Sequence, residues 1–174
     1  RLLADERLNR ESCRQMRLFI SGSAPLLAET HREFEFRTGH AILERYGMTE
    51  TVMLTSNPLD GDRIPGTVGY PLPGVEVRVT DPETGRALGQ GEIGGIEVKG
   101  PNVFSGYWRM PEKTAAEFRP DGFFITGDVG KIDERGYVHI VGRAKDLVIC
   151  GGYNVYPKEV ETRSEERRVG KECR

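Results

Sequence analysis

At 174 residues, the chain is long enough to form a domain of medium size with a hydrophobic core. Hydrophobic residues make up 37% of it and charged residues 30%, which is the composition of ordinary soluble proteins. The formal net charge of -2 provides no field that would attract nucleic acid or anionic lipid, so no nucleic-acid partner is expected. No apolar run approaches the ~20 residues of a transmembrane helix, and we expect no membrane span.

The cysteines indicate a reducing compartment. Cys13, Cys150 and Cys173 are odd in number and widely spaced, which favours neither a disulfide framework nor a zinc site. The cytoplasm fits, as does the mitochondrial matrix if the source is eukaryotic. The sequence opens at Arg1 with neither an initiating Met nor an apolar signal segment, and we interpret it as beginning within a longer protein.

The first third of the chain predicts a strand, a helix and a second strand. Residues 17–20 predict a short buried strand, and the small residues at 21–24 predict a turn. Pro25 suits the first position of a helix, which we expect over residues 26–38 before the left-handed terminator Gly39.

A second strand is predicted at residues 41–45, and it leads into the loop 46–50. This order is typical of a βαβ-like unit. In α/β proteins the loop that follows such a strand is where ligands usually bind.

From about Gly66 the pattern changes to short strands divided by turns, which is typical of a β-barrel or sandwich. Apolar and polar residues alternate over 75–80, and residues 81–85 supply a turn. Two glycines at 94–95 interrupt the next strand and indicate a bulge. The other expected elements are a strand region at 93–98, a helix at 111–118, a turn at 121–122, a strand at 123–126, a turn at 134–136 and a strand at 137–141.

Residues 143–146 (RAKD) form a polar joint between two apolar strands, 137–141 and 147–150, and predict a domain boundary. A loop at 151–154 and a helix beginning at Pro157 are expected next. Residues 163–174 are highly charged and have no apolar face. We interpret them as a non-native tail translated from a sequencing adapter; the alternative is an ordinary charged tail.

The loop 46–50 (YGMTE) contains groups that suit the binding of a nucleoside triphosphate. Tyr46 could stack on a purine, the Thr49 hydroxyl could bind a phosphate oxygen, and the Glu50 carboxylate could hold Mg²⁺ beside it. In the alternative interpretation the loop is ordinary, and Thr49 and Glu50 cap a following helix.

Two further segments carry candidate groups. Asp128 follows Thr126 and Gly127 at the expected end of a barrel strand, where its two oxygens could bind both hydroxyls of a ribose. Taken alone, such a tripeptide is usually a turn. Residues 142–146 (GRAKD) offer cations for a phosphate or for an interdomain ion pair, and taken alone they favour the ion pair.

The order of these segments resembles the adenylate-forming superfamily of acyl-CoA synthetases, adenylation domains and luciferases. The resemblance covers about residues 17–162 and rests on SGSAPL at 21–26, YGMTE at 46–50, the stretch 91–107, TGD at 126–128, and GRAKD at 142–146. It implies an α/β plus β fold. The chain is expected to hold the C-terminal part of the large N-terminal domain, which is a βαβ segment followed by a distorted β-barrel, and then the start of the small α+β C-terminal domain.

The resemblance also implies a division of the chain into parts. These are a partial α/β subdomain with the adenine and phosphate/Mg²⁺ site at 1–65, a β-barrel subdomain with the ribose site at 66–142, a hinge and the start of the C-terminal domain at 143–162, and the tail at 163–174.

Within the superfamily, the stretches 49–82 and 100–114 look most like malonyl-CoA synthetases. The implied activity is that of an ATP-dependent acid–CoA ligase, an AMP-forming acid–thiol ligase that uses ATP, Mg²⁺ and CoA to activate a small, malonate-like acid. Two alternatives stay open: an adenylation domain that loads a carrier protein, and a non-catalytic nucleotide-binding fragment. The oligomeric state is not indicated.

Roles follow for the residues that match the superfamily's motifs. Thr49 and Glu50 are the implied catalytic residues, Glu50 is the metal ligand, and Lys145 is the hinge about which the C-terminal domain rotates. The implied cofactor-binding residues are Gly22, Ser23, Ala24 and Pro25 against the adenine, Arg45, Tyr46 and Gly47 in and before the next loop, Asp128 and Arg143 on the ribose, and Gly151 and Gly152 beside the pantetheine.

The implied acid pocket is walled by Ser21 and Met48. The second carboxylate of malonate needs a cation. Arg17 and Arg32 are available, although each has an ordinary surface explanation.

Two elements of the superfamily are not found in this sequence: the upstream Gly/Ser/Thr-rich phosphate loop and the lysine of the C-terminal domain that acts in adenylation. Both contribute large electrostatic stabilisation to the reaction. We therefore expect the chain by itself to make no acyl-adenylate. The whole interpretation requires that the loop with Thr49 and Glu50 and the strand with Asp128 bind one ATP.

Overall fold

The computed structural model of the chain describes residues 2–24, 26–146, 148–150 and 153–155. The described residues form two compact units. The first contains the residues up to Val75 together with Pro101–Phe104, and the second contains Glu76–Gly100 and the residues from Ser105 onward. The subdomain boundaries expected from the sequence, after residues 65 and 142, stay predictions.

The first unit is built on a βαβ arrangement. Its described elements are η1 (Leu2–Ala4), α1 (Arg10–Cys13), β1 (Ile20–Ser21), α2 (Ala28–Thr38), β2 (Leu43–Tyr46), β3 (Thr55–Ser56) and β4 (Tyr70–Pro71). β1 pairs in parallel with β2, α2 connects them, and the pairs β2–β3 and β3–β4 are antiparallel. The strand order is β1-β2-β3-β4. The strand–helix–strand order predicted from the sequence is therefore present.

Three elements predicted in this unit have other boundaries in the structure, and the strand expected at 41–45 is Leu43–Tyr46. The strand expected at 17–20 is Ile20–Ser21, because the ladder with β2 covers only these two residues. The helix begins at Ala28, two residues later than expected, and it ends as predicted before Gly39, whose φ of 75° is left-handed. Pro25, which was expected at the first helical position, lies outside the described residues.

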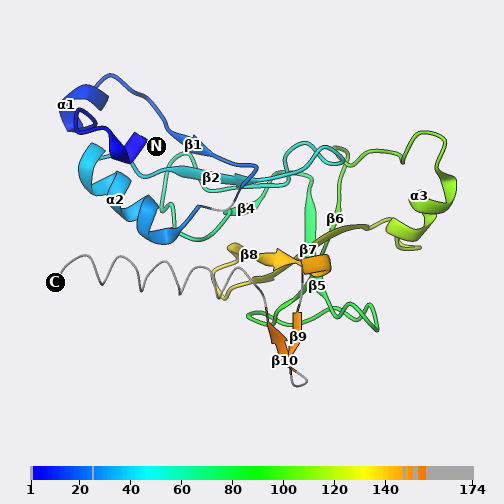
Figure 1. Cartoon of the computed structure of the whole chain (residues 1–174). Coiled ribbons are helices and arrows are strands. Elements are labelled where there is room, and N and C mark those ends of the chain that lie inside the picture. Colours follow the sequence, from blue (N-terminus) through cyan, green and yellow to red (C-terminus); the bar gives the residue numbers. More distant parts are fainter. Residues whose placement is uncertain (1, 25, 147, 151–152, 156–174) are drawn as a thin grey trace. The chain divides into compact units, whose positions relative to one another are not determined.

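The core of the first unit lies along one face of α2. His31, Phe34 and Thr38 are buried on this face. The ring of Phe34 packs edge-on against Phe19, with ring centroids 4.8 Å apart. α1 and α2 contact each other at one end of the unit (Figure 1), where Cys13 is a buried free thiol. The buried face of α2 therefore combines one aromatic and two polar side chains, and tertiary packing of this face stabilises the helix.

The second unit is built on an antiparallel sheet. Its described elements are β5 (Glu76–Thr80), β6 (Gly94–Lys99), α3 (Pro111–Glu117), β7 (Phe124–Ile132), β8 (Val138–Arg143), η2 (Ala144–Asp146), β9 (Val148–Cys150) and β10 (Tyr153–Val155). β9 and β10 form a separate antiparallel pair. Across both units, no helix in the described ranges combines the length and the apolar character that a membrane span requires.

The main sheet of the second unit is open in the described residues, whereas the sequence predicted a β-barrel or sandwich and the resemblance implied a distorted β-barrel. Its order is β5-β6-β7-β8, and in the part of the chain that the structure describes β5 and β8 do not pair with each other. Closed barrels usually need about five or more strands, which explains why four strands leave the sheet open. Ile96, Val98 and Phe124 from β6 and β7 are buried in the core of this sheet.

β7 is longer than predicted because a bulge lets it continue. Glu97 of β6 faces Ile125 of β7, whereas Gly95 faces Val129, so two residue steps on β6 oppose four steps on β7. Gly127 lies in this bulge with a left-handed φ of 73°. The strand expected at 123–126 therefore runs over Phe124–Ile132.

A buried carboxylate ties three segments of the second unit together. Glu97 is 1% exposed, and its oxygens lie 2.7 Å from Arg78 and 2.7 Å from Arg119. The hydroxyl of Thr80 donates to it at 3.0 Å. Burial alone raises the pKa of Glu97, but the hydrogen bonds from Arg119, Arg78 and Thr80 outweigh it and hold this pKa below its usual value of 4.5. The charged form is therefore the one that stabilises the fold.

We predict that Glu97→Gln lowers the free energy of unfolding at neutral pH by about 3 kcal/mol, because two arginines lose their buried partner. A lowered folded-state pKa gives a contribution that is complete above the usual value of 4.5 and is lost as the pH falls through the folded-state pKa. The gap between wild type and variant should therefore shrink toward acidic pH in urea unfolding. The exposed Glu134→Gln is the control, and a gap that does not depend on pH would contradict the prediction.

Candidate functional site

Two loops leave the same edge of the parallel pair β1–β2. Residues 22–24 follow β1, and residues 47–53 follow β2. A Cβ atom on Gly22 would lie 3.5 Å from the carbonyl oxygen of Arg45, so the first of these loops begins in contact with the end of β2. The carboxyl edge of parallel strands is the usual ligand-binding edge of α/β proteins. The structure thus brings together the segments predicted for adenine and for phosphate, and their roles in binding stay predictions.

The loop after β2 turns back on itself at Gly47. A Cβ atom there would lie 1.9 Å from the carbonyl oxygen of Val52, so only glycine fits. The turn is closed by Thr51, whose backbone N–H donates to the carbonyl oxygen of Met48 at 3.1 Å. Val52 has a φ of 56°, a left-handed conformation that is strained for a β-branched residue. The main chain of this loop is therefore tightly constrained.

Thr49 and Glu50 lie in this turn, and the segment that follows is β3. The alternative in which these two residues cap a helix is therefore wrong. Thr49 is exposed and Glu50 is half-buried. The carboxylate of Glu50 is a hard oxygen ligand of the kind that Mg²⁺ requires, and the hydroxyl of Thr49 can donate a hydrogen bond to a phosphate oxygen.

A magnesium ion that arrives with a polyphosphate fits this donor set. Within the described ranges there is no group of three or more His, Cys, Asp or Glu side chains that could hold a metal ion. Mg²⁺ bound to nucleotide phosphates needs only one or two protein carboxylates, because phosphate and water oxygens complete its shell. The carboxylate of Glu50 meets that requirement at a constrained position of the loop.

A distant segment supports the loop through hydrogen bonds. This segment is Pro101–Phe104, which we call the strap. The side-chain amide of Asn102 donates to the carbonyl oxygens of Thr51 at 2.7 Å and Met53 at 2.9 Å, and the last strap residue donates its N–H to the carbonyl oxygen of Glu50 at 2.8 Å. The sequence analysis used this stretch only for the family resemblance. No local pattern links it to partners about 50 residues away.

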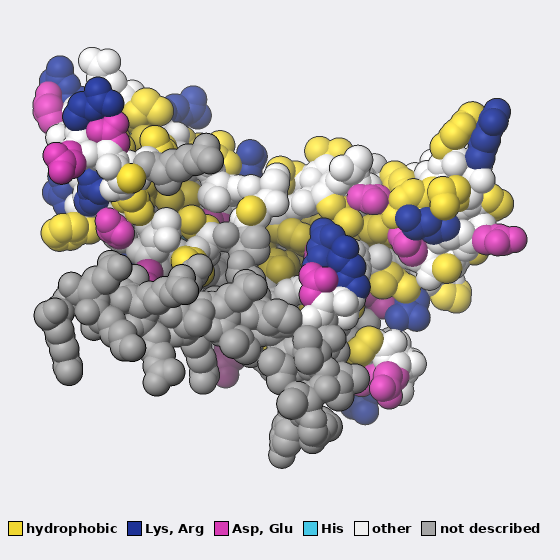
Figure 2. Space-filling view, in the orientation of Figure 1, with side chains coloured by type: hydrophobic (Ala, Val, Ile, Leu, Met, Phe, Trp, Pro, Cys, Tyr) yellow, Lys and Arg dark blue, Asp and Glu magenta, His cyan; other side chains and the backbone are white. Residues whose placement is uncertain are grey.

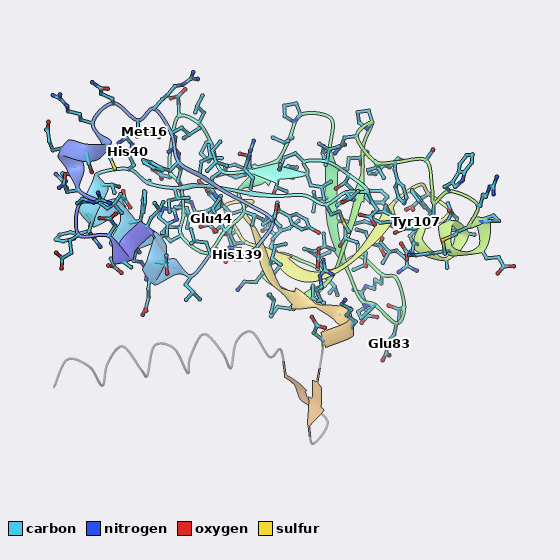
Figure 3. All side chains as sticks on the ribbon, turned by 45° about the horizontal axis from the view of Figure 1, so that its top comes forward. Met16, His40, Glu44, Glu83, Tyr107 and His139 are labelled. Carbon is cyan, nitrogen blue, oxygen red and sulfur yellow. The ribbon has the colours of Figure 1, made fainter. Side chains whose placement is uncertain are left out.

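A buried polar pair lies next to the loop on β2. His31 of α2 is fully buried, and its Nδ1 lies 3.1 Å from the buried carboxylate of Glu44 (labelled in Figure 3). Among the described side chains, His31 Nε2 and Arg45 Nε are buried without a hydrogen-bond partner. Ser21 and Met48, the predicted walls of the acid pocket, are both partly buried. The sequence analysis assigned no role to the His31–Glu44 pair.

In the second unit the structure brings Asp128 and Arg143 together. They face each other across the β7–β8 ladder, and Arg143 Nε lies 3.3 Å from Asp128 Oδ1. The side chain of Asp128 is 8% exposed and that of Arg143 is 53% exposed. Thr126 fixes the bulge, because its hydroxyl donates to Ile96 at 2.8 Å and accepts from the N–H of Asp128 at 3.1 Å. Asp128 was expected at a strand end; the bulge places it inside β7 instead.

The predicted hinge begins at the end of β8. Arg143 is followed by η2 (Ala144–Asp146), and Lys145 is exposed within it. Gly151 and Gly152 lie outside the described residues, as do the helix expected at Pro157 and the tail 163–174. The hinge and pantetheine roles stay predictions.

A shallow hollow of about 460 Å³ lies beside α3, and none of the predicted site residues that the structure describes lines it. It is lined by aromatic and small residues, including Tyr107, Trp108 and Phe118. Hydrophobic side chains gather around α3 (Figure 2), and Trp108 is 84% exposed. The hydroxyl of Tyr107 (Figure 3) donates to Glu117 at 2.6 Å, so this ring is held against the helix.

Comparisons with known proteins point to one family. The chain matches the model of the AMP-binding enzyme family over residues 1–108. Malonate–CoA ligase of Arabidopsis thaliana is 47% identical over 163 residues, which are 93% of this chain and 26% of that protein. The ATP-bound crystal structure of MatB from Rhodopseudomonas palustris is 74% identical, with a TM-score of 0.90, over 92% of this chain and 32% of that one.

A malonyl-CoA ligase solved as a ternary product complex with methylmalonyl-CoA and AMP is also similar. It is 49% identical, with a TM-score of 0.72, over 88% of this chain and 33% of that one. The chain thus spans 26% to 33% of the length of these three relatives.

We predict that Gly47→Ala destabilises the first unit by about 1–3 kcal/mol, because the added methyl overlaps the Val52 carbonyl. Gly22→Ala is the matched control, since its Cβ has 3.5 Å of clearance and should leave stability unchanged. Urea unfolding of the three proteins measures the difference. Equal stabilities for the two variants would show that the close approach at Gly47 is wrong.

Proposed function

We propose, because the chain belongs to the AMP-binding enzyme family, that it carries part of the nucleotide site of an AMP-forming acid–CoA ligase. The observation that carries the proposal is the carboxyl edge of β1–β2, from which the loops 22–24 and 47–53 both leave. Tyr46, the last residue of β2, supplies an aromatic ring at this edge, and the loop after it supplies the hydroxyl of Thr49 and the carboxylate of Glu50. The similarity to ATP-bound MatB over 92% of the chain supports the same assignment.

The proposed reaction has two halves. A carboxylate oxygen of the acid attacks the α-phosphorus of ATP, the bond to the β-phosphate oxygen breaks, and acyl-adenylate and pyrophosphate form. The thiol of CoA then attacks the acyl carbon, AMP leaves with the bonding pair, and the thiol proton passes to solvent. No enzyme nucleophile is consumed. The protein contributes mainly positioning and electrostatic stabilisation.

Each predicted residue has a role in this proposal. Gly22, Ser23 and Ala24 lie against the adenine, where small side chains let the base approach the backbone. Tyr46 stacks on the base. The hydroxyl of Thr49 donates to a phosphate oxygen. Bound Mg²⁺ supplies neutralisation of phosphate charge, and Glu50 holds it.

The second unit contributes the ribose contacts and the hinge. Asp128 accepts hydrogen bonds from the ribose hydroxyls, and Arg143, whose Nε lies 3.3 Å from Asp128 Oδ1, orients the carboxylate. Lys145, in the exposed turn η2, is the pivot for rotation of the C-terminal domain between the two half-reactions. In this proposal the β5–β8 sheet is part of a distorted β-barrel. The small C-terminal domain follows the barrel in the chain.

We propose malonate or a similarly small acid as the substrate. Names of relatives support this choice: a malonate–CoA ligase at 47% identity and a malonyl-CoA ligase at 49% identity with methylmalonyl-CoA bound. No described residue is assigned to the second carboxylate. Arg17 and Arg32 are both exposed, as expected for ordinary surface residues.

The test is to replace the matching segment of R. palustris MatB by residues 17–162 of this chain. The release of AMP by this exchanged enzyme is then measured with malonate and CoA. We expect the exchanged enzyme to be active. Glu50→Gln should lower kcat/KM about 100-fold or more, because Mg²⁺ and the phosphates lose a positioned charge. The exposed helix variant Glu35→Gln should match the parent. A Glu50→Gln enzyme with the same kcat/KM as the parent would overturn the assignment. Transfer of the acyl group to a carrier protein but not to CoA would overturn it as well.

A second prediction concerns the sugar. Asp128→Asn in the exchanged enzyme should weaken the binding of ATP about 10- to 100-fold, because hydrogen bonds to a charged acceptor are lost. 2′,3′-Dideoxy-ATP has no hydroxyls to lose and should be affected less than twofold. The exposed loop variant Asp60→Asn is the control. Equal losses for both nucleotides would show that Asp128 does not bind the ribose.

A further inference from the structure

The strap Pro101–Phe104 donates hydrogen bonds to main-chain carbonyls of the loop after β2. Three such bonds reach the carbonyl oxygens of Glu50, Thr51 and Met53, at 2.8, 2.7 and 2.9 Å. Two of the three come from one nitrogen, Nδ2 of Asn102. A single side chain therefore fixes the loop at two positions.

The two carbonyls that Asn102 binds flank Val52, the strained residue of the loop. Its φ of 56° is unfavourable for a β-branched side chain and persists only where the surroundings over-determine it. Gly47 supplies a further constraint, because its α-carbon approaches the Val52 carbonyl too closely for any Cβ. The strain and the hydrogen bonds are independent observations, and both indicate that this conformation is actively held.

The chemistry of asparagine suits this task. A primary amide nitrogen carries two hydrogens, and each can donate to a separate carbonyl. The other amide atom, Asn102 Oδ1, is buried without a hydrogen-bond partner among the described residues. A buried unsatisfied acceptor is unfavourable. The amide is thus retained despite this penalty, which favours a specific need for its two donors.

We propose that Asn102 is a positioning residue for the phosphate end of the nucleotide site. It binds no ligand itself. By holding the main chain at Thr51 and Met53 it fixes the orientation of Thr49 and Glu50, which lie directly before them. The inference rests on the proposed function. It adds to the site a residue that lies 51 positions after Thr51 and 49 positions after Met53 in the chain.

The proposal has a selective consequence. Ligands that carry phosphates and Mg²⁺ depend on the loop, whereas adenosine depends on residues 22–24, on Tyr46 and on the proposed ribose contact of Asp128. Asn102→Ala should therefore weaken binding of ATP with Mg²⁺ about 10- to 100-fold, since small errors in the position of a binding group are costly. Adenosine binding should change less than about twofold, because its contacts do not use the held carbonyls.

The experiment measures the dissociation constants of Mg²⁺–ATP and of adenosine for the 174-residue chain by calorimetry. The ratio of the two constants is the readout, because unfolded protein lowers the apparent number of sites and leaves this ratio unchanged. Asn102→Gln retains the donating amide and should recover part of the ratio. In amide NMR spectra of the free chain, Asn102→Ala should move the signals of Thr49 and Glu50 and leave that of Gly22 in place.

The matched control is Asn57→Ala in the same unit. Asn57 is also buried, and its Nδ2 donates to the carbonyl oxygens of Glu44 at 3.3 Å and Thr67 at 2.9 Å. It makes the same kind of contact without touching the carbonyls at Thr51 and Met53. We expect this variant to lower the stability of the chain and to keep the wild-type ratio.

The outcomes separate the two proposals. If the wild-type chain binds neither ligand, the proposed nucleotide site is wrong and the inference falls with it. If the wild type binds both and Asn102→Ala keeps the wild-type ratio, the inference alone is wrong. Equal weakening of both ligands, as for a general loss of structure, would overturn it as well.

Discussion

The parallel pairing of β1 with β2 determines where the candidate site lies. These strands are short, and their ladder joins Ile20 to Leu43 and Ser21 to Glu44. Because both strands run in the same direction, the loops that follow them must leave at one edge. α2 connects the two strands and buries His31 against Glu44 of β2. The helix and this strand are therefore joined by a polar contact as well as by apolar packing. The positions of the two loops depend on this arrangement.

Two buried carboxylates on neighbouring strands of the second unit, Glu97 and Asp128, have different surroundings. Glu97 is enclosed by Arg78, Arg119 and Thr80, which leave its oxygens well satisfied. Such a group stabilises the fold and has little capacity for a ligand. Asp128 faces an arginine that is 53% exposed, and it lies in a bulge, where strands often redirect a side chain. The ribose contact of Asp128 stays a proposal.

Local signals in the sequence predicted local structure well. Gly39 was expected to end a helix and does so, and the turn at 81–85 forms around the side chain of Asp81, which accepts hydrogen bonds from Thr84. The extension of β7 was missed, because Gly127 breaks the alternation that marks a strand while its left-handed φ lets the strand continue. The role of Asn102 could not be read at all, since its partners are distant in sequence and are backbone atoms that any residue possesses.

The strap also affects how this protein can be divided. Its four residues belong to the first unit, yet they lie in the chain between two stretches of the second, Glu76–Gly100 and the residues from Ser105 onward. A gene truncated after Val75 would encode the loop of Thr49 and Glu50 without the three hydrogen bonds that support it. The first unit is therefore not a contiguous module. Any attempt to recombine it with another protein has to carry these residues along.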